Sequence, residues 1–328
     1  MINELQFNGF KSFLSADIEF APLTILTGLN SSGKSSVIQA IRMLDRIAQG
    51  EVDPLLKEYG SAKDLRNPNV LKWGITALYS NERKIEITEG HYSNPTPNGY
   101  AKIMYVSAGR LGPQVSLKIR KDSILDENGE NVLKCLEDNQ DLIIPEGLRH
   151  PNAEGNTLLY NVRAWLGTIS PRVEFKWDIN EDTDSSYSLF DGHRAKNVGF
   201  GLSYTLPILV ALLLAAAQGN TIVLLENPEA HLHPRGQVEM AMLVAKAVEC
   251  GVQVIVETHS DHFFDGIRIA VKEAEGNSLA TNVLAYWFEL NGFKNTQYEQ
   301  CTMDSDGRMI KWPKGMFDQF ELDALKLM

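Results

Sequence analysis

The chain has 328 residues, of which 44% are hydrophobic and 22% are charged, and its formal net charge is −11. This composition supplies a large buried core, in one large domain or two closely associated ones, and it excludes a disordered protein. The acidic balance argues against a generally basic nucleic-acid binder but leaves room for a local basic patch. Residues 102–121 are the densest basic stretch, and a solvated strand face is favoured there over a phosphate-contacting surface.

The targeting and redox features predict a cytoplasmic protein. Residues 1–20 scatter charged side chains among apolar ones and contain no apolar core of a signal peptide. The three cysteines, Cys135, Cys250 and Cys301, are odd in number and far apart, which indicates neither a disulfide framework nor a zinc site. The longest apolar run, Leu206–Ala217, contains a proline and is too short to span a bilayer, so we expect a buried helix.

The start of the chain predicts two or three short strands, with a turn around Asn8-Gly9. The last of them, Leu23–Thr27, reads as a short buried strand. It is followed by GLNSSGKSS, residues 28–36, which matches the phosphate-loop pattern G-x-x-x-x-G-K-[ST] at every fixed position. Apolar residues then recur with helical period over Ser35–Gln49. Strand, loop and helix follow one another in the order that this motif requires.

The residue types in this loop suit the binding of a nucleotide such as ATP. Gly28 and Gly33 allow backbone N–H groups to turn toward an anion at a helix N-terminus, where the helix dipole also favours negative charge. Lys34 is expected to reach the β- and γ-phosphates, and the Ser35 hydroxyl to coordinate Mg²⁺. The residues predicted to contact ATP are Asn30, Ser31, Ser32, Gly33, Lys34, Ser35 and Ser36.

The middle of the chain carries weaker patterns. Residues 121–197 are polar and uneven, and they predict an inserted subdomain with a loop at Glu181–Ser186. Another loop is expected at Ser93–Gly99. Short strands are predicted at Lys84–Thr88, Lys102–Ser107 and Gln114–Arg120.

The second half of the chain supplies a carboxylate at the end of a buried strand. Thr221–Glu226 is apolar without alternation, as expected for a strand of a parallel sheet that is covered on both faces. A carboxylate in this position, beside a phosphate loop, can hold the Mg²⁺ shell directly or through water, and we expect this role for Glu226. A helix is predicted from about Arg235 to Glu249, and a second buried strand, Val252–Glu257, runs directly into Thr258-His259-Ser260.

These motifs, in this order, resemble those of an ABC-type ATPase head of the SMC/RecF and OLD-like (AAA ATPase) branch. The resemblance is carried by the phosphate loop, ENPEAHLHP at 226–234 and ETHS at 257–260, and the opening FKSF at 10–13 is similar. The ending WPKGMFDQF, at 312–320, resembles a C-terminal domain of unknown function found in a bacterial subset. The resemblance implies an α/β fold of the P-loop NTPase type, with a mixed or parallel sheet core, an N-terminal antiparallel β subdomain and a helical or irregular insertion.

We expect four regions along the chain. An N-terminal lobe contains the phosphate loop and the antiparallel strands, and an inserted subdomain follows it. The next lobe contains a signature loop, the strand Thr221–Glu226, which matches the Walker B strand of the resembled heads with Glu226 as its acid, and a switch histidine. A family-specific extension ends the chain. The predicted boundaries are 1–120, 121–197, 198–284 and 285–328.

The resemblance also implies a dimer of heads. Heads of this branch hold two ATP molecules between the phosphate loop of one subunit and a signature loop of the other. The candidate here is VGFGLS at 198–203, in which Gly201 and Ser203 are expected at the nucleotide, although the usual Ser-Gly-Gly-Gln is absent. A helix is predicted over Tyr204–Ala217, with Ser203 as its N-cap and Pro207 in its first turn. A plain glycine turn before a core helix is the alternative.

Two histidines match functional positions of the resembled branch. His259 falls at the switch histidine that contacts the γ-phosphate, and His233 matches the loop that crosses to the partner subunit. The pair His231 and His233 has the spacing of metal ligands, but no carboxylate or cysteine cluster with ligand spacing accompanies it, so metal binding is not favoured.

One residue departs from the resembled pattern. The heads place the glutamate that polarises the attacking water directly after the Walker B acid, where this chain has Asn227. An amide orients a water but cannot accept its proton, so we expect either slow hydrolysis or substitution by another carboxylate. Glu229 and Glu257 are the candidates, and a structural role is equally open for each. The predicted catalytic set is Glu226, Asn227, Glu229 and His259.

Arg110 lies in YVSAGRLGP, residues 105–113, a segment that also resembles the bacterial subset. A contact to a phosphate or a partner and a surface ion pair are both open for this side chain.

Three functions follow from the resemblance. The first is an ATPase that closes as a homodimer, or higher oligomer of heads, and gates an effector in bacterial anti-phage defence. The sequence contains no nuclease-type metal cluster, so the effector, expected to be a nuclease, is a separate protein. The second is a RecF-like DNA-repair ATPase, for which a stronger basic surface than this one is expected. DNA is a possible partner, and no membrane partner is expected. The third is an ATP-dependent scaffold that barely hydrolyses, which Asn227 favours. A transporter subunit is least favoured.

Overall fold

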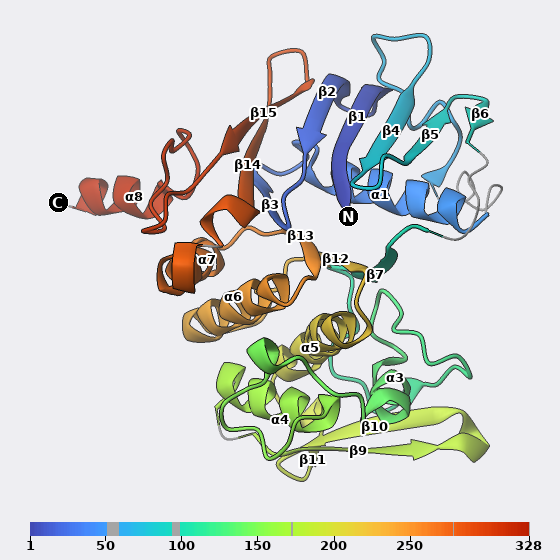
Figure 1. Cartoon of the computed structure of the whole chain (residues 1–328), viewed down its shortest axis with the longest axis vertical. Helices are drawn as coiled ribbons and strands as arrows, with labels where there is room; N and C mark the ends of the chain where they lie inside the picture. The colour runs from blue at the N-terminus through green and yellow to red at the C-terminus, as the bar shows by residue number, and fades with distance from the viewer. Residues whose placement is uncertain (51–58, 94–98, 172, 278, 328) are drawn as a thin grey trace. The chain divides into compact units, whose positions relative to one another are not determined.

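The computed structural model describes residues 1–50, 59–93, 99–171, 173–277 and 279–327 (Figure 1). Contacts between residues divide the chain into two compact units. Unit 1 contains Met1–Ile103, Asn282–Asp304 and Met309–Met328, and unit 2 contains Met104–Thr281 and Ser305–Arg308.

An antiparallel sheet forms one part of unit 1 (Figure 1). Its strand order is β2-β1-β4-β5-β6, and every neighbouring pair is antiparallel. Burial alternates along β4, with Ile75, Ala77 and Tyr79 buried and the residues between them partly exposed, as expected when one face of a sheet covers a core. The expected N-terminal antiparallel β subdomain is therefore confirmed. The strands are β1 (Ile2–Phe10), β2 (Phe13–Glu19), β4 (Gly74–Tyr79), β5 (Lys84–Thr88) and β6 (His91–Tyr92).

The turn expected around Asn8-Gly9 is wrong. β1 continues through both residues to Phe10, and the chain turns at Lys11, which has a left-handed φ of 50°. Gly9 also has a positive φ of 65°, and a Cβ on it would lie 2.4 Å from Cγ2 of Val70. The glycine therefore serves a close approach of the chain to Val70 within the strand, which is the other use of such a residue in β structure.

A second set of strands in unit 1 carries the phosphate-loop candidate. β3 (Leu23–Gly28) is buried along its whole length and runs parallel to β14 (Val283–Leu290), while β15 (Thr296–Cys301) is antiparallel to β14. α1 (Lys34–Ala48) follows β3 and packs against β3, β4 and β5. The nine-residue helix α8 (Gln319–Leu327) ends the described chain.

Unit 2 is built around two parallel buried strands. β12 (Thr221–Glu226) pairs with β13 (Gln253–Glu257) from Ile222 opposite Gln253 to Glu226 opposite Glu257. β7 (Lys102–Val106), whose last three residues belong to this unit, is the other neighbour of β12. The parallel pair here and the mixed set in unit 1 confirm the expected α/β fold with a parallel or mixed sheet.

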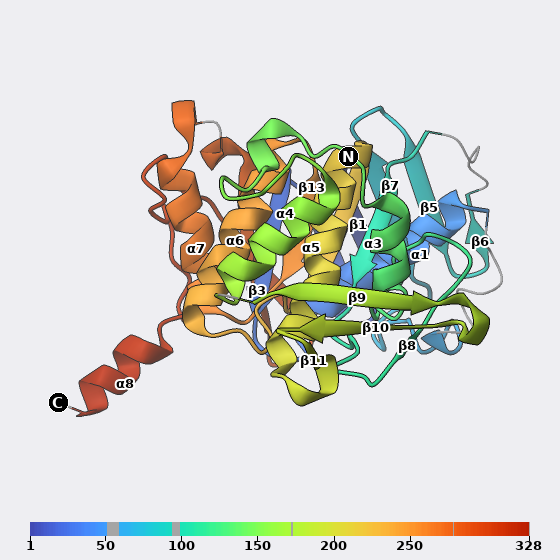
Figure 2. The same cartoon turned by 90° about the horizontal axis from the view of Figure 1, so that it is seen from below.

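Helices cover these strands in unit 2. α5 packs on β12 and on α4, and α6 packs on α7 and β13; Figure 2 shows α4, α5 and α6 side by side. Their bounds are α3 (Val132–Asn139), α4 (Leu158–Ile169), α5 (Phe200–Gln218), α6 (Pro234–Glu249) and α7 (Asp261–Glu273). Single 3₁₀ turns lie at Glu146–Leu148, Ala195–Asn197, Glu275–Asn277 and Ala280–Asn282.

α5 begins four residues earlier than expected. Gly199, with extended backbone angles, is its N-cap, so Ser203 lies inside the helix, and the prediction of Ser203 as N-cap is wrong. Pro207 consequently falls in the helix interior rather than in the first turn. Because proline has no backbone N–H, the carbonyl of Ser203 lacks its helical hydrogen bond. Glycine can supply the extended N-cap conformation without a side-chain oxygen, which the sequence pattern did not reveal.

α5 is also the one helix in the described part of the chain that is long and apolar enough to cross a bilayer. Its most apolar window is 67% buried inside the structure. Core helices of globular proteins pass the same test of length and composition, and the packing of α5 against β12 and α4 fits that class.

Residues 121–197 are more regular than expected. Besides α3 and α4 they form a hairpin of β9 (Phe175–Asn180) and β10 (Ser185–Phe190), whose turn occupies most of the expected loop Glu181–Ser186. β10 also pairs with β11 (His193–Arg194) and β8 (Leu117–Lys118), so only two residues of the strand expected at Gln114–Arg120 form one. In the loop expected at Ser93–Gly99, residues 94–98 lie outside the described residues.

Candidate functional site

The phosphate-loop candidate of unit 1 connects β3 to α1 directly. β3 ends at Gly28, and α1 begins at Lys34 with Gly33 as its N-cap. Three residues of the connection have a positive φ: Gly28 at 139°, Ser31 at 62° and Gly33 at 114°. Such a backbone turns successive N–H groups inward and forms a concave anion-binding surface at a helix N-terminus.

The two glycines are required by close contacts within unit 1. A Cβ on Gly28 would lie 2.1 Å from the carbonyl oxygen of Phe288 on β14, and one on Gly33 would lie 2.6 Å from Oγ1 of Thr296 on β15. The loop is thus packed against two strands that come from the far end of the chain. Any larger residue at either position would push the loop away from this support.

Thr296 also holds the loop through hydrogen bonds. Its Oγ1 lies 2.8 Å from the carbonyl oxygen of Ser32 and 2.7 Å from Oγ of Ser12, so the hydroxyl can donate to the carbonyl while it accepts from Ser12. The backbone N–H of Thr296 donates to the Ser12 carbonyl at 2.8 Å. Sequence reasoning missed Thr296, because a single threonine 264 residues away from Ser32 gives no local signal.

Lys34 is directed toward its own loop. Its Nζ donates to the carbonyl oxygens of Gly28 at 2.9 Å and Leu29 at 2.8 Å, and the side chain is 3% exposed. Nearby in the sequence motif FKSF, the Nζ of Lys11 donates to Oε1 of Gln39 on α1, and burial lowers the pKa of Lys11. Lys11 is thus a second lysine, beside Lys34, that contacts this part of unit 1. The sequence motif contains it, but the sequence alone assigned it no role.

The acidic candidates of unit 2 lie at the ends of the two parallel strands. Glu226 ends β12 and Glu257 ends β13 in the paired register. One carboxylate oxygen of Glu226 accepts a hydrogen bond from the backbone N–H of Ala108 at 2.9 Å. The backbone N–H of Asn227 donates to the Glu257 carbonyl at 2.8 Å, which ties the start of the following loop to the neighbouring strand.

Asn227 has a left-handed backbone with φ of 45°. Asparagine tolerates this conformation better than most residues other than glycine. Its side-chain oxygen is buried and has no hydrogen-bond partner among the described residues. The position therefore provides a sharp turn directly after the acidic strand end, together with a side-chain oxygen that has no hydrogen-bond partner in the described parts of the chain.

Glu229 and His259 are brought together within unit 2. Oε1 of Glu229 accepts the backbone N–H of His259 at 2.9 Å, whereas its buried Oε2 has no partner among the residues that the structure describes. Burial raises the pKa of Glu229, and this shift is opposed by the hydrogen bond from the His259 N–H and by the charge of Arg110. A carboxyl group with a raised pKa and one unsatisfied oxygen is better suited to accept a proton near neutral pH than an exposed one.

Arg110 is a buried residue and makes no ion pair with another residue that the structure describes. It is 3% exposed, and its guanidinium donates to three backbone carbonyls: Ser107 at 2.6 Å, Glu226 at 2.7 Å and Asn227 at 2.8 Å. Burial lowers the pKa of Arg110 to about 10, against the favourable charges of Glu229 and Glu226. Of the two interpretations that the sequence left open, the surface ion pair is therefore wrong.

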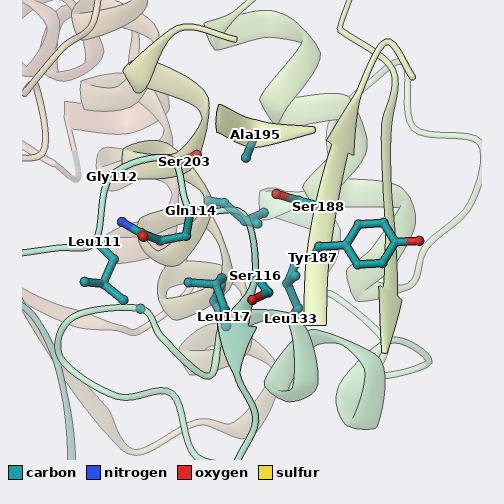
Figure 3. A pocket seen from close by; sticks show the side chains of 13 residues that line it. Leu111, Gly112, Gln114, Ser116, Leu117, Leu133, Tyr187, Ser188, Ala195 and Ser203 are labelled. Atoms are coloured by element: carbon teal, nitrogen blue, oxygen red, sulfur yellow. The ribbon is translucent and has the colours of Figure 1, made fainter. Parts of the chain in front are cut away.

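The N-terminal turn of α5 carries the signature candidate. Gly201 is the second residue of the helix, and a Cβ on it would lie 2.9 Å from the carbonyl oxygen of His231. Ser203 lies deeper and lines a small pocket of unit 2 with Leu111 and Ala195 (Figure 3). The structure therefore places Gly201 at the open end of the helix and Ser203 against its own unit.

The two histidines of the His-Leu-His segment lie in different surroundings. The His231 ring packs on the rings of Tyr204 and Phe200, with centroids 4.5 and 5.3 Å apart. Nδ1 of His233 accepts the backbone N–H of Arg235 at 3.3 Å and caps α6.

A phosphate loop between a buried strand and a helix, with a buried strand elsewhere that ends in a carboxylate, defines a nucleotide-binding protein of the P-loop class. Family models agree with this class. An AAA ATPase domain matches residues 167–264, an AAA domain matches residues 4–44, and a protein family of unknown function (DUF3696) matches residues 280–327.

Solved structures identify the architecture more closely. An SMC head bound to the C-terminal winged-helix domain of ScpA is 15% identical with a TM-score of 0.57, over 92% of this chain and 97% of that one. SMC head domains from Pyrococcus furiosus and Pyrococcus yayanosii are 12% and 11% identical with a TM-score of 0.56 each. They cover 99% of this chain and 98% and 99% of their own. No curated protein matches the chain.

The chain thus has the fold of an SMC head, and the resemblance to ABC-type ATPases of the SMC/RecF branch is confirmed by the fold and by the two ATPase family models.

The contact of Thr296 with the phosphate loop yields a prediction. Thr296→Val removes the hydroxyl but keeps the shape, leaving the Ser32 carbonyl without its donor, and we expect ATP affinity to fall about tenfold because the loop loses its support. Fluorescent ATP-analogue titration measures the change. Thr296→Ser keeps the hydroxyl and is the matched control, with affinity near that of the wild type. Equal affinity in the valine variant would contradict the role assigned to this contact.

The raised pKa of Glu229 yields a second prediction. A group whose folded-state pKa is raised stabilises the fold below its unfolded pKa and loses that contribution as pH rises through the folded value. Glu229→Gln is neutral throughout, so wild type should lose stability relative to this variant as pH rises above about 4.5, the ordinary value. Urea unfolding at pH 5 and pH 8 measures both proteins. A stability difference that is independent of pH would show that Glu229 is not desolvated in the folded protein.

Proposed function

We propose that this protein binds ATP at the loop Gly28–Ser36 and hydrolyses it. The observation that carries the proposal is the loop itself: its positive-φ backbone, the N-terminus of α1 and the inward Lys34 ammonium are the groups that phosphates require. The remaining loop residues expected at the nucleotide are Asn30, Ser31, Ser32, Ser35 and Ser36. The Ser35 hydroxyl is proposed to coordinate Mg²⁺. The Glu226 carboxylate is proposed as a Mg²⁺ ligand from the resemblance stated for the sequence motifs.

Glu229 is the proposed general base. Asn227 cannot accept a proton, while Glu229 has a buried oxygen without a partner among the described residues and a pKa raised by burial. In this assignment Asn227 orients the water, and His259, whose backbone N–H binds Glu229, contacts the γ-phosphate. Glu257 is less suited to be the base. It pairs with Glu226 in the sheet, and its backbone carbonyl accepts the N–H of Asn227, so we assign it a structural role beside the site.

Dimerisation on ATP is the next part of the proposal. The first turn of α5 presents N–H groups without intrahelical partners at Gly201, and the helix dipole adds positive charge there. Phe200, the first residue of the helix, is 55% exposed, which suits a surface that a second head covers. His233, on the loop after β12, is proposed to lie at the same interface.

The dimer is proposed to gate a separate effector, a nuclease, in bacterial defence, in the cytoplasm. The resemblance stated for the sequence motifs supports this assignment. An SMC head that is similar to this chain was solved with a domain of ScpA bound, so the fold can receive a separate protein partner.

An ATP-dependent scaffold that hydrolyses slowly is the second candidate, and Asn227 favours it. The residue that follows Glu226 is Asn227, which lies in a left-handed turn and whose backbone carbonyl accepts a hydrogen bond from Arg110. If Glu229 serves only the fold, ATP would act as a clamp that holds two heads together.

Steady-state turnover separates the two candidates. We expect Lys34→Ala to weaken ATP binding at least tenfold, because the charged hydrogen-bond donor is lost. Glu229→Gln and Glu226→Gln should bind ATP and lose most of their turnover, whereas Arg163→Lys, on the exposed side of α4, should behave as wild type. Phosphate release measures turnover. Wild-type turnover in Glu229→Gln would refute the base assignment, and absent wild-type turnover that appears in Asn227→Glu would establish the scaffold.

The interface at α5 is tested by mass measurement in the presence of ATP. Phe200→Asp places a charge where the second head is proposed to pack, so the dimer dissociation constant should rise at least tenfold. Ile269→Asp, at a 42% exposed position on α7 of the same unit, is the matched control. Light scattering after size exclusion, with and without ATP, reports the dimer. An undiminished dimer in Phe200→Asp would exclude α5 from the interface.

A further inference from the structure

The buried guanidinium of Arg110 occupies an unusual position in unit 2. Two of its three carbonyl partners belong to Glu226 and Asn227. Glu226 is the last residue of β12, and Asn227 is the first residue of the loop that follows. The planar fork of an arginine binds two neighbouring acceptors at once, which the ammonium of a lysine cannot do with the same geometry. Arg110 therefore fixes the direction in which the chain leaves the acidic strand end.

That direction determines where the acidic groups lie. Asn227 is held in a left-handed turn, and the loop after it returns Glu229 to the backbone N–H of His259. The preceding segment contributes as well, because the N–H of Ala108, two residues before Arg110, binds the Glu226 carboxylate. One short segment thus holds both the backbone and the carboxylate of the strand end.

The same guanidinium also contacts the signature helix. Its central carbon lies 5.4 Å from the centroid of the Tyr204 ring, on the second turn of α5. Tyr204 packs on His231, and both rings pack on Phe200, the exposed first residue of the helix, with centroids 4.5, 5.3 and 6.3 Å apart. His231 belongs to the loop that begins at Asn227. The aromatic cluster therefore forms a second contact between this loop, which follows β12, and the first turns of α5.

We propose that Arg110 is a positioning residue that couples the first turn of α5 to the end of β12. When a second head covers that turn, Phe200 and Tyr204 are displaced, and the Tyr204 ring that contacts the guanidinium moves with them. The guanidinium then carries the change to the carbonyls of Glu226 and Asn227, and so to Glu229. Through the contact between Arg110 and Tyr204, covering of α5 thus changes the positions of the acidic groups. This inference rests on the proposed ATPase function for its catalytic consequence and on the described contacts of unit 2 for its mechanical one.

The test compares Arg110→Lys with two variants of its ring partner, all in the full chain. Arg110→Lys keeps the charge but not the fork, and it should lower kcat at least tenfold while ATP affinity, measured by titration, changes less than threefold. Tyr204→Leu should lower kcat in the same way, Tyr204→Phe should restore it, and the double variant Arg110→Lys/Tyr204→Leu should be no worse than Arg110→Lys. Wild-type kcat in Arg110→Lys, or additive losses in the double variant, would overturn the proposal.

A second readout separates this proposal from the ATPase itself. Hydrogen exchange should become faster in Arg110→Lys over both residues 226–231 and residues 200–205, and remain unchanged in both segments in Arg163→Lys, whose guanidinium also rests on a ring, that of Trp177. Unchanged exchange in Arg110→Lys would overturn the coupling whether or not the protein hydrolyses ATP. A wild-type protein without turnover, or one whose Lys34→Ala variant binds ATP normally, would refute the proposed function and leave the exchange result to decide the coupling.

Discussion

A strand that is covered on both faces can carry polar groups only at its end, and unit 2 depends on this constraint. β13 is buried throughout and β12 is buried up to Leu225, and the carboxylates of the two strands are their paired last residues, Glu226 and Glu257. The acidic groups of these two strands are therefore concentrated at one edge. The price is a cluster of charges and carbonyls in partly buried surroundings, which needs partners to be stable.

Arg110 supplies those partners in an indirect way. A buried cation that binds carbonyl groups compensates the negative ends of peptide dipoles and leaves the carboxylates of Glu226 and Glu229 available. In unit 1 the phosphate loop is supported similarly: Thr296 and the backbone of Phe288 hold it from strands of the far end of the chain. In both units the residues assigned to chemistry are held by others that have no chemical role of their own.

The sequence predicted the elements near its motifs well. β3, α1, β12 and α6 begin and end within two residues of the expected positions, because a phosphate loop or a run of buried residues leaves little freedom. It failed where local signals competed. Gly9 was interpreted as a turn, although it serves a close contact with Val70, and the hairpin of β9 and β10 was hidden by polar residues on its exposed face.

The sequence by itself determined the class of the protein, since motif order and buried strands are local properties, and it supplied the list of candidate residues. Only the tertiary structure decided how these residues are arranged within each unit. It buried Arg110 against carbonyls 116 and 117 residues away and left one oxygen of Glu229 without a partner among the described residues. It also began α5 at Phe200 and turned Ser203 inward. Burial and hydrogen bonding depend on segments that are distant in the chain, and no local pattern records which of them will meet.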